Sequence, residues 1–200
     1  MNLVTPSQSW SFSFKVKQSR FISYLRQCET GSDFKSWLSQ LRKDHYDASH
    51  ICWAYRIQDG SQLEHHSSDA GEPSGTAGQP ILKAMKQNNL VQCGLAVARY
   101  FGGTKLGKRG LINAYGTAAR NVIDQTTLIE WVRKERYLIT CPIQYYGDLS
   151  RALLQTGEKI LEDQSSNDLK WIVEIKTGMI SDLIKIVRTV TKGEGDLDRV

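Results

Sequence analysis

The sequence predicts a protein of the α+β class, with an N-terminal α+β domain at residues 1–132 and a smaller, ferredoxin-like domain at residues 137–200. Strand-like alternation and helix-like periodicity are mixed over the first part of the chain. The pattern breaks at residues 126–136, where charges of both signs gather, and we place the domain boundary there. The last part has the order strand, helix, strand, strand, helix, with a final strand near Leu197, which is the split-βαβ order of ferredoxin-like domains.

The first predicted elements are two strands and a helix. Apolar and polar side chains alternate over residues 10–16, which predicts a half-buried strand, and residues 20–25 predict a second one. Apolar residues recur at helical spacing over residues 34–41, and Ser32 is the candidate N-cap of this helix. We expect the apolar stripe of the helix to face the core.

A hairpin is predicted next. Residues 51–57 and 62–66 have strand character, and Asp59-Gly60 between them is a turn signal. His65 and His66 are adjacent in the second strand, so we expect one to face the core and the other to face solvent. That arrangement argues against a shared metal ion, and we predict no metal site.

The elements that follow alternate between helix and strand. Proline suits a first helical turn, so a helix is predicted from about Pro80 to Gln87. Residues 95–98 predict a buried strand, and a helix with an apolar face of small residues is predicted from about Gly110. In the C-terminal domain the predicted strands are 137–145, 159–163 and 169–176, and the predicted helices are 148–155 and 181–190.

Two glycine-rich stretches, residues 69–80 and residues 99–107, are the most distinctive part of the chain. Glycine permits positive φ and close backbone approach, so both stretches predict shaped loops. A glycine-rich turn that opens a helix leaves N–H groups able to hold an anion. The alternative is that both loops are only tight connections.

The net charge of +5 is concentrated in one segment. Residues 1–72 carry eight basic and eight acidic side chains, whereas residues 73–123 carry seven basic side chains and no acidic one. The seven are Lys83, Lys86, Arg99, Lys105, Lys108, Arg109 and Arg120. A basic segment without carboxylates suits a polyanion such as nucleic acid or a phosphate group. The alternative is a set of solvated surface cations.

Residues 102–108 match the G-x-x-x-x-G-K core of a nucleotide-binding phosphate loop. The next residue is Arg109, where that loop needs a hydroxyl to hold magnesium, so we do not expect nucleotide hydrolysis. Binding of a phosphate group by the glycine backbone, Lys105 and Lys108 remains an alternative. The candidate nucleic-acid or phosphate-binding residues are Arg99, Gly102, Gly103, Lys105, Gly107, Lys108 and Arg109.

Asp69 and Glu72 are paired carboxylates, a combination that can perform acid–base catalysis. The favoured interpretation is structural: Asp69 caps loop amides, and Glu72 pairs with a cation such as Arg99 or Lys105. The sequence identifies neither a nucleophile with its base nor a cofactor fingerprint. We therefore predict no catalytic residue and no cofactor.

The cysteine pattern and the hydropathy predict a cytoplasmic protein. Four widely spaced cysteines without a Cys-x-x-Cys pair favour reduced, mostly buried thiols. No apolar run approaches the roughly 20 residues of a membrane span. Residues 1–20 lack the continuous apolar segment of a secretory signal. We expect no membrane partner.

Three long motifs resemble the IMPACT/YigZ family in its bacterial two-domain form, and together they cover most of residues 15–125. They are residues 48–56, residues 68–82, and residues 99–107 continuing to Gly110-Leu111 and Ala114-Tyr115. The second motif contains the signature-loop residues Asp69, Glu72, Ser74, Gly75, Thr76 and Gly78.

Three positions depart from the family's pattern. Ala70 stands where the family usually has a second Asp, Arg109 where it usually has Gly, and Asn113 where an Arg is common. The missing acid weakens any mechanism based on a carboxylate pair. Arg109 restores the positive charge that is missing at Asn113.

The resemblance implies an N-terminal domain similar to the second domain of a ribosomal small-subunit protein and to domain IV of elongation factor G. It also implies a ferredoxin-like C-terminal domain similar to another elongation-factor domain. Eukaryotic members of the family act in translational control through protein contacts. Bacterial two-domain members are suspected of binding nucleic acid or the ribosome, and the resemblance implies no enzymatic activity.

We therefore predict a non-enzymatic, translation-associated regulator that binds RNA or the ribosome through a basic glycine-rich face. One alternative is an enzyme or binder that acts on a small phosphorylated ligand. The other is a regulator of translational control that works through protein–protein contacts.

Overall fold

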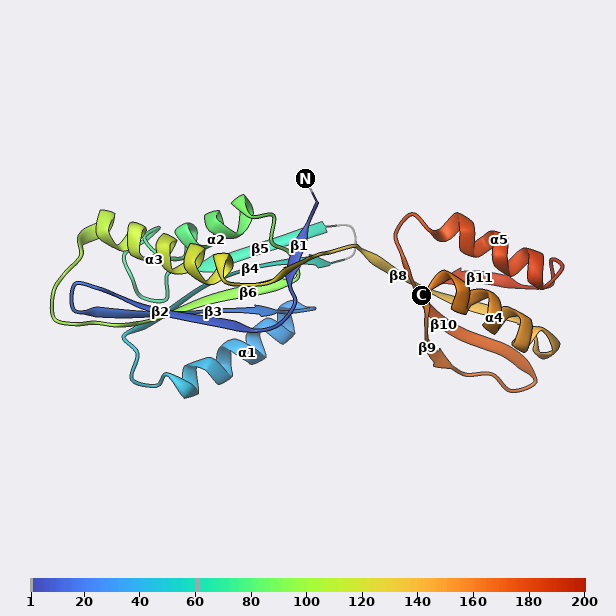
Figure 1. Cartoon of the computed structure of the whole chain (residues 1–200). Coiled ribbons are helices and arrows are strands. Elements are labelled where there is room, and N and C mark those ends of the chain that lie inside the picture. Colours follow the sequence, from blue (N-terminus) through green and yellow to red (C-terminus); the bar gives the residue numbers. More distant parts are fainter. Residues whose placement is uncertain (1, 60–61) are drawn as a thin grey trace. The chain divides into compact units, whose positions relative to one another are not determined.

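The computed structural model describes residues 2–59 and 62–200. The chain divides into two compact units, Met1–Trp131 and Val132–Val200. Figure 1 shows strands and helices mixed in both units. The α+β fold class predicted from the sequence is confirmed.

Unit 1 is built on a five-stranded antiparallel sheet with the order β2-β3-β6-β4-β5. The central strand, β6, is covered on both faces, and residues 93–99 are all buried. This explains its uninterrupted apolar sequence, because a strand covered on both faces has no solvent side. The strands are β2 (Trp10–Val16), β3 (Ser19–Gln27), β4 (His50–Asp59), β5 (Gln62–Ser68) and β6 (Cys93–Tyr100).

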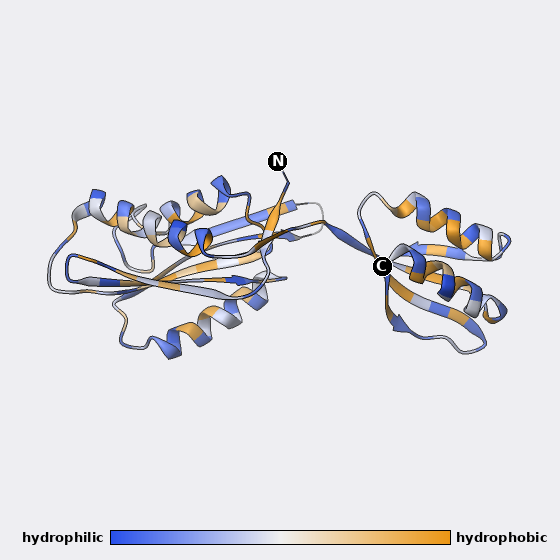
Figure 2. Ribbon diagram, viewed as in Figure 1, coloured by the Kyte–Doolittle hydropathy of each residue, from blue (hydrophilic) through white to orange (hydrophobic). Residues whose placement is uncertain are grey.

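Helices cover both faces of this sheet. Helix α1 (Gly31–Asp44) lies on one face, and α2 (Gly78–Gln87) and α3 (Gly107–Asp124) lie side by side on the other (Figure 1). In Figure 2 apolar residues follow β6 between the two helical layers. The larger core cluster is on the α2–α3 side. A short pair of strands, β1 (Val4–Pro6) and β7 (Leu128–Glu130), joins the two ends of the unit.

Two details of the predicted elements in unit 1 are wrong. The N-cap of α1 is Thr30, whose hydroxyl accepts a hydrogen bond from the amide of Asp33 at 3.0 Å. Thr30 has the extended backbone that a cap requires, whereas Ser32 is already inside the helix. Helices α2 and α3 also begin two and three residues before the predicted Pro80 and Gly110.

The predicted β4–β5 hairpin forms, with Asp59 opposite Gln62, and the predicted Asp59-Gly60 turn falls on Gly60, outside the described residues. His65 and His66 are both exposed, so the expectation that one would face the core is wrong. The reason is that β5 is the edge strand of the sheet.

Unit 2 has the element order β8, α4, β9, β10, α5, β11 and an antiparallel sheet of order β11-β8-β10-β9, which is a split-βαβ arrangement. Helix α4 ends at Gly157, whose φ of 74° is the left-handed C-cap conformation. The elements are β8 (Lys134–Pro142), α4 (Tyr146–Thr156), β9 (Lys159–Asp163), β10 (Asp168–Lys176), α5 (Ile180–Val190) and β11 (Asp196–Arg199).

The strand predicted to reach Tyr145 ends at Pro142, and a short 3₁₀ helix, Ile143–Tyr145, follows. The partner strand β10 begins at Asp168, which lies opposite Pro142. Beyond that point β10 offers no backbone groups to pair with. Apolar content alone therefore overestimated the length of this strand.

Candidate functional site

The signature loop, residues 69–80, is organised around the carboxylate of Asp69. One oxygen accepts hydrogen bonds from the amides of Ala77 and Gly78 at 2.9 and 2.8 Å, and the other accepts from Gly75 at 2.8 Å. Partial burial opposes ionisation, but the three amide bonds outweigh it and lower the pKa of Asp69 below its ordinary value of 3.8. The predicted capping role of Asp69 is confirmed.

This arrangement uses the amides that would otherwise make the start of α2 an anion site. Ala77, the N-cap residue of α2, has no side-chain oxygen of its own, and Asp69 supplies the acceptor from outside the helix. Gly78 is required beside it, because a Cβ there would lie 2.8 Å from the backbone of Ser68. The first glycine-rich loop thus binds an internal carboxylate.

Glu72 and Arg99 form a buried ion pair that joins the two glycine-rich stretches. The Glu72 Oε1 atom lies 2.6 Å from Arg99 Nη1, and the two side chains are only 3% and 7% exposed. The hydroxyl of Tyr115 donates to the same carboxylate oxygen at 2.8 Å, and burial raises the pKa of Tyr115 far above its ordinary range. The rings of Phe21 and Phe101 lie 5.6 and 5.4 Å from the Arg99 guanidinium.

The ion pair corrects one predicted site residue. Arg99 was expected among the phosphate-binding residues, but it is 5% exposed and its guanidinium is committed to Glu72. The other predicted role, pairing between Glu72 and a cation such as Arg99, is confirmed. Thr76 is also buried, and its hydroxyl donates to the Pro73 carbonyl at 2.6 Å, whereas Ser74 is exposed.

Two side chains from β4 donate hydrogen bonds to backbone carbonyls of the signature loop. The Cys52 thiol donates to the carbonyl of Asp69 at 2.9 Å, and the His50 Nδ1–H donates to the carbonyl of Ala70 at 2.9 Å. Burial raises the pKa of Cys52 to about 12, so the thiol keeps the proton that it donates. The sequence does not reveal these two hydrogen bonds, and their only signal in it is that both residues lie in the motif at residues 48–56.

The second glycine-rich stretch forms the loop between β6 and α3. Gly102 packs so closely against the turn after β2 that a Cβ would lie 1.9 Å from the Gln18 carbonyl oxygen. Gly103 and Gly107 have φ values of 85° and 71°, which favour glycine. Leu106, the N-cap residue of α3, provides no capping oxygen, and the first turn of α3 has no acidic residue. The start of α2 shares both features, but its Ala77 and Gly78 amides donate to the carboxylate of Asp69 from outside the helix.

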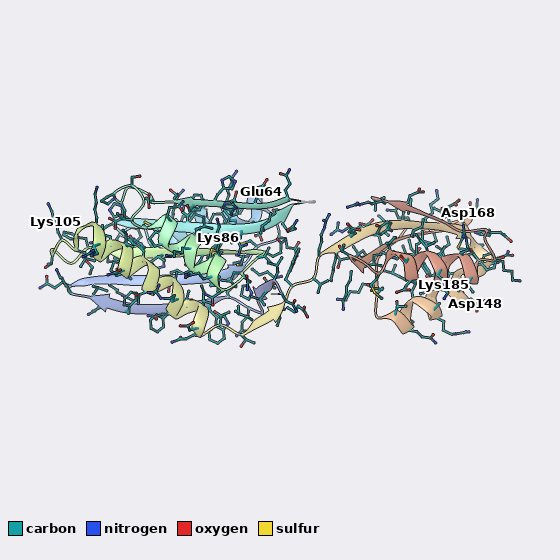
Figure 3. All side chains as sticks on the ribbon, turned by 90° about the horizontal axis from the view of Figure 1, so that it is seen from above. Glu64, Lys86, Lys105, Asp148, Asp168 and Lys185 are labelled. Carbon is teal, nitrogen blue, oxygen red and sulfur yellow. The ribbon has the colours of Figure 1, made fainter. Side chains whose placement is uncertain are left out.

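The cations of residues 73–123 gather on one face of unit 1. Six of the seven are exposed, and the exception is Arg99. All six belong to α2, α3 or the loop before α3, which form the layer on one side of the sheet (Figure 1). Figure 3 looks onto this layer and labels Lys86 on α2 and Lys105 in the loop. The six are Lys83, Lys86, Lys105, Lys108, Arg109 and Arg120.

Of the aromatic residues Tyr100, Phe101 and Tyr115, Phe101 is the one with substantial exposure, at 48%. Tyr115 is fully buried. Tyr100 is half-buried, and its hydroxyl lies 2.6 Å from His45 Nδ1. One side of the Phe101 ring lies against the Arg99 guanidinium, and the other side of the ring is available to a ligand.

Other kinds of site are not found in the described part of the chain. No group of three or more His, Cys, Asp or Glu side chains in residues 2–59 and 62–200 is placed to hold a metal ion. No helix of that part is both long and apolar enough to cross a membrane. The four cysteines are free and buried, as predicted.

The fold and the site together define a class of α+β protein in which a buried ion pair joins two glycine-rich loops beside a basic helical layer. The Impact N-terminal domain family matches residues 17–123. A solved structure described as that of a hypothetical protein has a TM-score of 0.77 and 25% identity, and the match covers 100% of this chain and 98% of that one.

The curated relatives agree with this match. The IMPACT family member YvyE of Bacillus subtilis is 26% identical over 96% of this chain and 88% of its own length. An IMPACT family member of Haemophilus influenzae is 34% identical, covering 78% and 74% of the two chains. The IMPACT family member YigZ of Escherichia coli is 32% identical, covering 74% and 72%. The chain belongs to the IMPACT family, and this membership supports a translation-related regulatory role at the level of the family.

Proposed function

We propose that this protein is a non-enzymatic, translation-associated regulator that binds RNA or the ribosome. The binding surface is the basic glycine-rich face, made of Gly102, Gly103, Lys105, Gly107, Lys108 and Arg109. The observation that carries the proposal is the absence of acidic residues from residues 73–123, combined with the exposure of six of their seven cations on one helical layer.

The chemistry of this face suits phosphate groups. Lysine and arginine side chains that neutralise phosphates release bound counterions, which drives association with nucleic acid. The start of α3 adds the partial positive charge of a helix N-terminus, with no acidic side chain in its first turn. Arg109 and Asn113 are four residues apart on α3, so their side chains are neighbours on the helix surface. Arg109 can therefore supply positive charge near Asn113.

The internal contacts weigh against the alternative of an enzyme acting on a phosphorylated ligand. Asp69 is occupied by three backbone amides, and Glu72 is occupied by Arg99 and Tyr115. A general base needs a carboxylate that can reach a substrate. Both candidate bases instead hold the loops in place.

Co-sedimentation with ribosomal subunits and with total RNA across a salt series tests the proposal. We expect binding at low salt that weakens steeply as salt rises, with a slope of about 0.7 to 0.9 per phosphate neutralised. Lys105→Ala/Lys108→Ala should weaken binding and flatten the slope. Lys35→Ala/Lys43→Ala is the matched control, because it removes two exposed cations from α1 on the opposite face.

Co-sedimentation and a pull-down from cell extract, with and without nuclease, together separate the competing functions. If the protein ignores both RNA and ribosomes at low salt, the proposal is wrong. A protein partner that co-purifies at stoichiometric amounts and survives nuclease treatment would favour the protein-interaction alternative. Loss of all partners on nuclease treatment supports the proposal.

A further inference from the structure

A groove of about 660 Å³ lies between α2 and α3, in the same layer as the basic glycine-rich face. Three cations line it: Lys83 and Lys86 from α2, and Arg120 from α3. Its remaining polar lining consists of amide side chains, including Gln79 and Asn113, and no lining residue is acidic. Volume and charge together make this groove a candidate binding site that local sequence patterns do not reveal.

We infer that this groove holds the sugar–phosphate backbone of a single-stranded RNA segment, an inference that rests on the proposed function. Lys83 and Lys86 are three residues apart and so lie on one side of α2, and Arg120 faces the groove from α3. The cations therefore border the groove from both helices. The amide side chains can donate and accept hydrogen bonds, which suits ribose hydroxyls.

The lining also indicates the mode of recognition. No aromatic side chain lines the groove, so stacking of bases on its walls is not available. The large aliphatic side chains that line the groove are Leu82, which is 5% exposed, and Ile112, which is 43% exposed. Phosphate contacts give affinity without reading base identity. We therefore expect the groove to bind RNA with little sequence preference.

The groove continues the basic glycine-rich face along α3. Lys108, Ile112, Gly116 and Arg120 follow one another at intervals of four, so they form one row that is inclined to the helix axis. From Lys108 to Arg120 the helix rises about 18 Å at 1.5 Å per residue. A strand that contacts the loop before α3 can follow this row into the groove.

Gly116 is the residue that gives the groove room for Arg120. Glycine in a helix interior costs about 1 kcal/mol relative to alanine, so its presence in α3 needs a reason. A Cβ at this position would lie 3.3 Å from Arg120 Nη1 and 3.9 Å from the Cζ and Nη2 atoms of the same guanidinium. The Arg120 Nη2 atom also donates to Thr117 Oγ1 at 3.1 Å. The missing Cβ lets the guanidinium lie close against the helix.

Fluorescence anisotropy with a labelled 20-nucleotide polyuridylate tests the inference. The groove variant is Lys83→Gln/Lys86→Gln/Arg120→Gln. The control is Lys35→Gln/Arg42→Gln/Lys43→Gln, which removes the same charge from exposed positions of α1. We expect the groove variant to lose at least about tenfold in affinity at low salt and to lower the salt slope by about 2, since three lost phosphate contacts each contribute about 0.7. The control should change both values far less.

A second variant tests whether a loss of RNA affinity can arise from the groove without any loss of charge. Gly116→Ala keeps every charge but adds a Cβ against the Arg120 guanidinium. We expect it to raise the urea midpoint of unfolding, because alanine favours the helix. It should also weaken RNA binding severalfold. A purely structural glycine would leave RNA binding unchanged.

The outcomes distinguish this inference from the proposed function. If wild type binds RNA, and the groove variant binds like the control while Lys105→Gln/Lys108→Gln/Arg109→Gln loses affinity, the groove inference is overturned and the proposed function stands. If wild type does not bind RNA at low salt, both are overturned. If polyglutamate binds wild type as tightly as polyuridylate does, the groove takes an acidic protein segment, which also overturns the inference.

Discussion

The Glu72 carboxylate and the Arg99 guanidinium meet at 2.6 Å in the interior of unit 1, although 26 residues separate them in the sequence. Their contact joins the signature loop to the end of β6, and therefore to the loop that carries the basic glycine-rich face. A buried ion pair of this kind contributes little net stability compared with an apolar pair, but removal of one partner leaves an uncompensated charge. The pair therefore fixes the geometry of the two loops.

The first prediction concerns this pair. Glu72→Gln should lower the free energy of unfolding by about 3 kcal/mol or more, because it leaves Arg99 charged and buried without its counter-charge. Urea denaturation at neutral pH measures the change. The double variant Glu72→Gln/Arg99→Met should recover part of the loss, because it removes the orphaned charge. A loss below about 0.5 kcal/mol for Glu72→Gln would show that the ion pair is not needed.

The second prediction concerns Asp69 and pH. Asp69→Asn should cost about 1–2 kcal/mol at neutral pH, because the amide replaces one of the two oxygens that accept from the loop and from α2. The folded protein lowers the Asp69 pKa below 3.8, so the contribution of its charge is present above that pH and is lost as pH falls through the folded-state pKa.

The measurement is a pair of urea curves for wild type and Asp69→Asn at several pH values. The difference between the two proteins should be constant from neutral pH down to about pH 5 and should shrink below about pH 4. A difference that stays unchanged at low pH would contradict the role assigned to the ionised carboxylate.

The third prediction concerns the packing of Gly102 against Gln18. Gly102→Ala should destabilise unit 1 by about 2 kcal/mol or more, because its Cβ would overlap the Gln18 carbonyl and force the backbone to move. The control is Gly147→Ala in the first turn of α4, where a Cβ meets no atom within 4 Å. Thermal unfolding monitored by circular dichroism should show a lowered midpoint for Gly102→Ala. The midpoint of Gly147→Ala should not be lowered. Equal midpoints would contradict the close approach of Gly102 to Gln18.

The fourth prediction concerns the cysteines. Burial raises the pKa of Cys28 and of Cys52 to about 12, and it also raises the pKa of Cys93 and Cys141. At pH 8 each buried thiol is therefore less ionised than in the unfolded chain, and burial also shields it from iodoacetamide. Mass spectrometry should find no modified cysteine in the native state and four after denaturation. Rapid modification of one thiol in the native protein would identify a reactive cysteine that the structure does not predict.

Local rules predicted most elements of this protein, because their signals lie within a few residues. The apolar periodicity of residues 34–41 and the apolar run of residues 95–98 both correspond to elements of the structure. The same rules failed where a partner decided the outcome. The strand predicted to reach Tyr145 ends where β10 begins, and His66 is exposed because β5 has no strand beyond it.

The sequence by itself determined the α+β class, the family, and the concentration of positive charge in residues 73–123. Charge is a property of composition, and long motifs in a fixed order identify a family without coordinates. Only the tertiary structure decided which of those charges face solvent. It buried Arg99 against Glu72, assigned Asp69 to the start of α2, and placed Lys83, Lys86 and Arg120 around one groove. These relationships depend on distances between residues far apart in the chain, and composition and local spacing do not contain them.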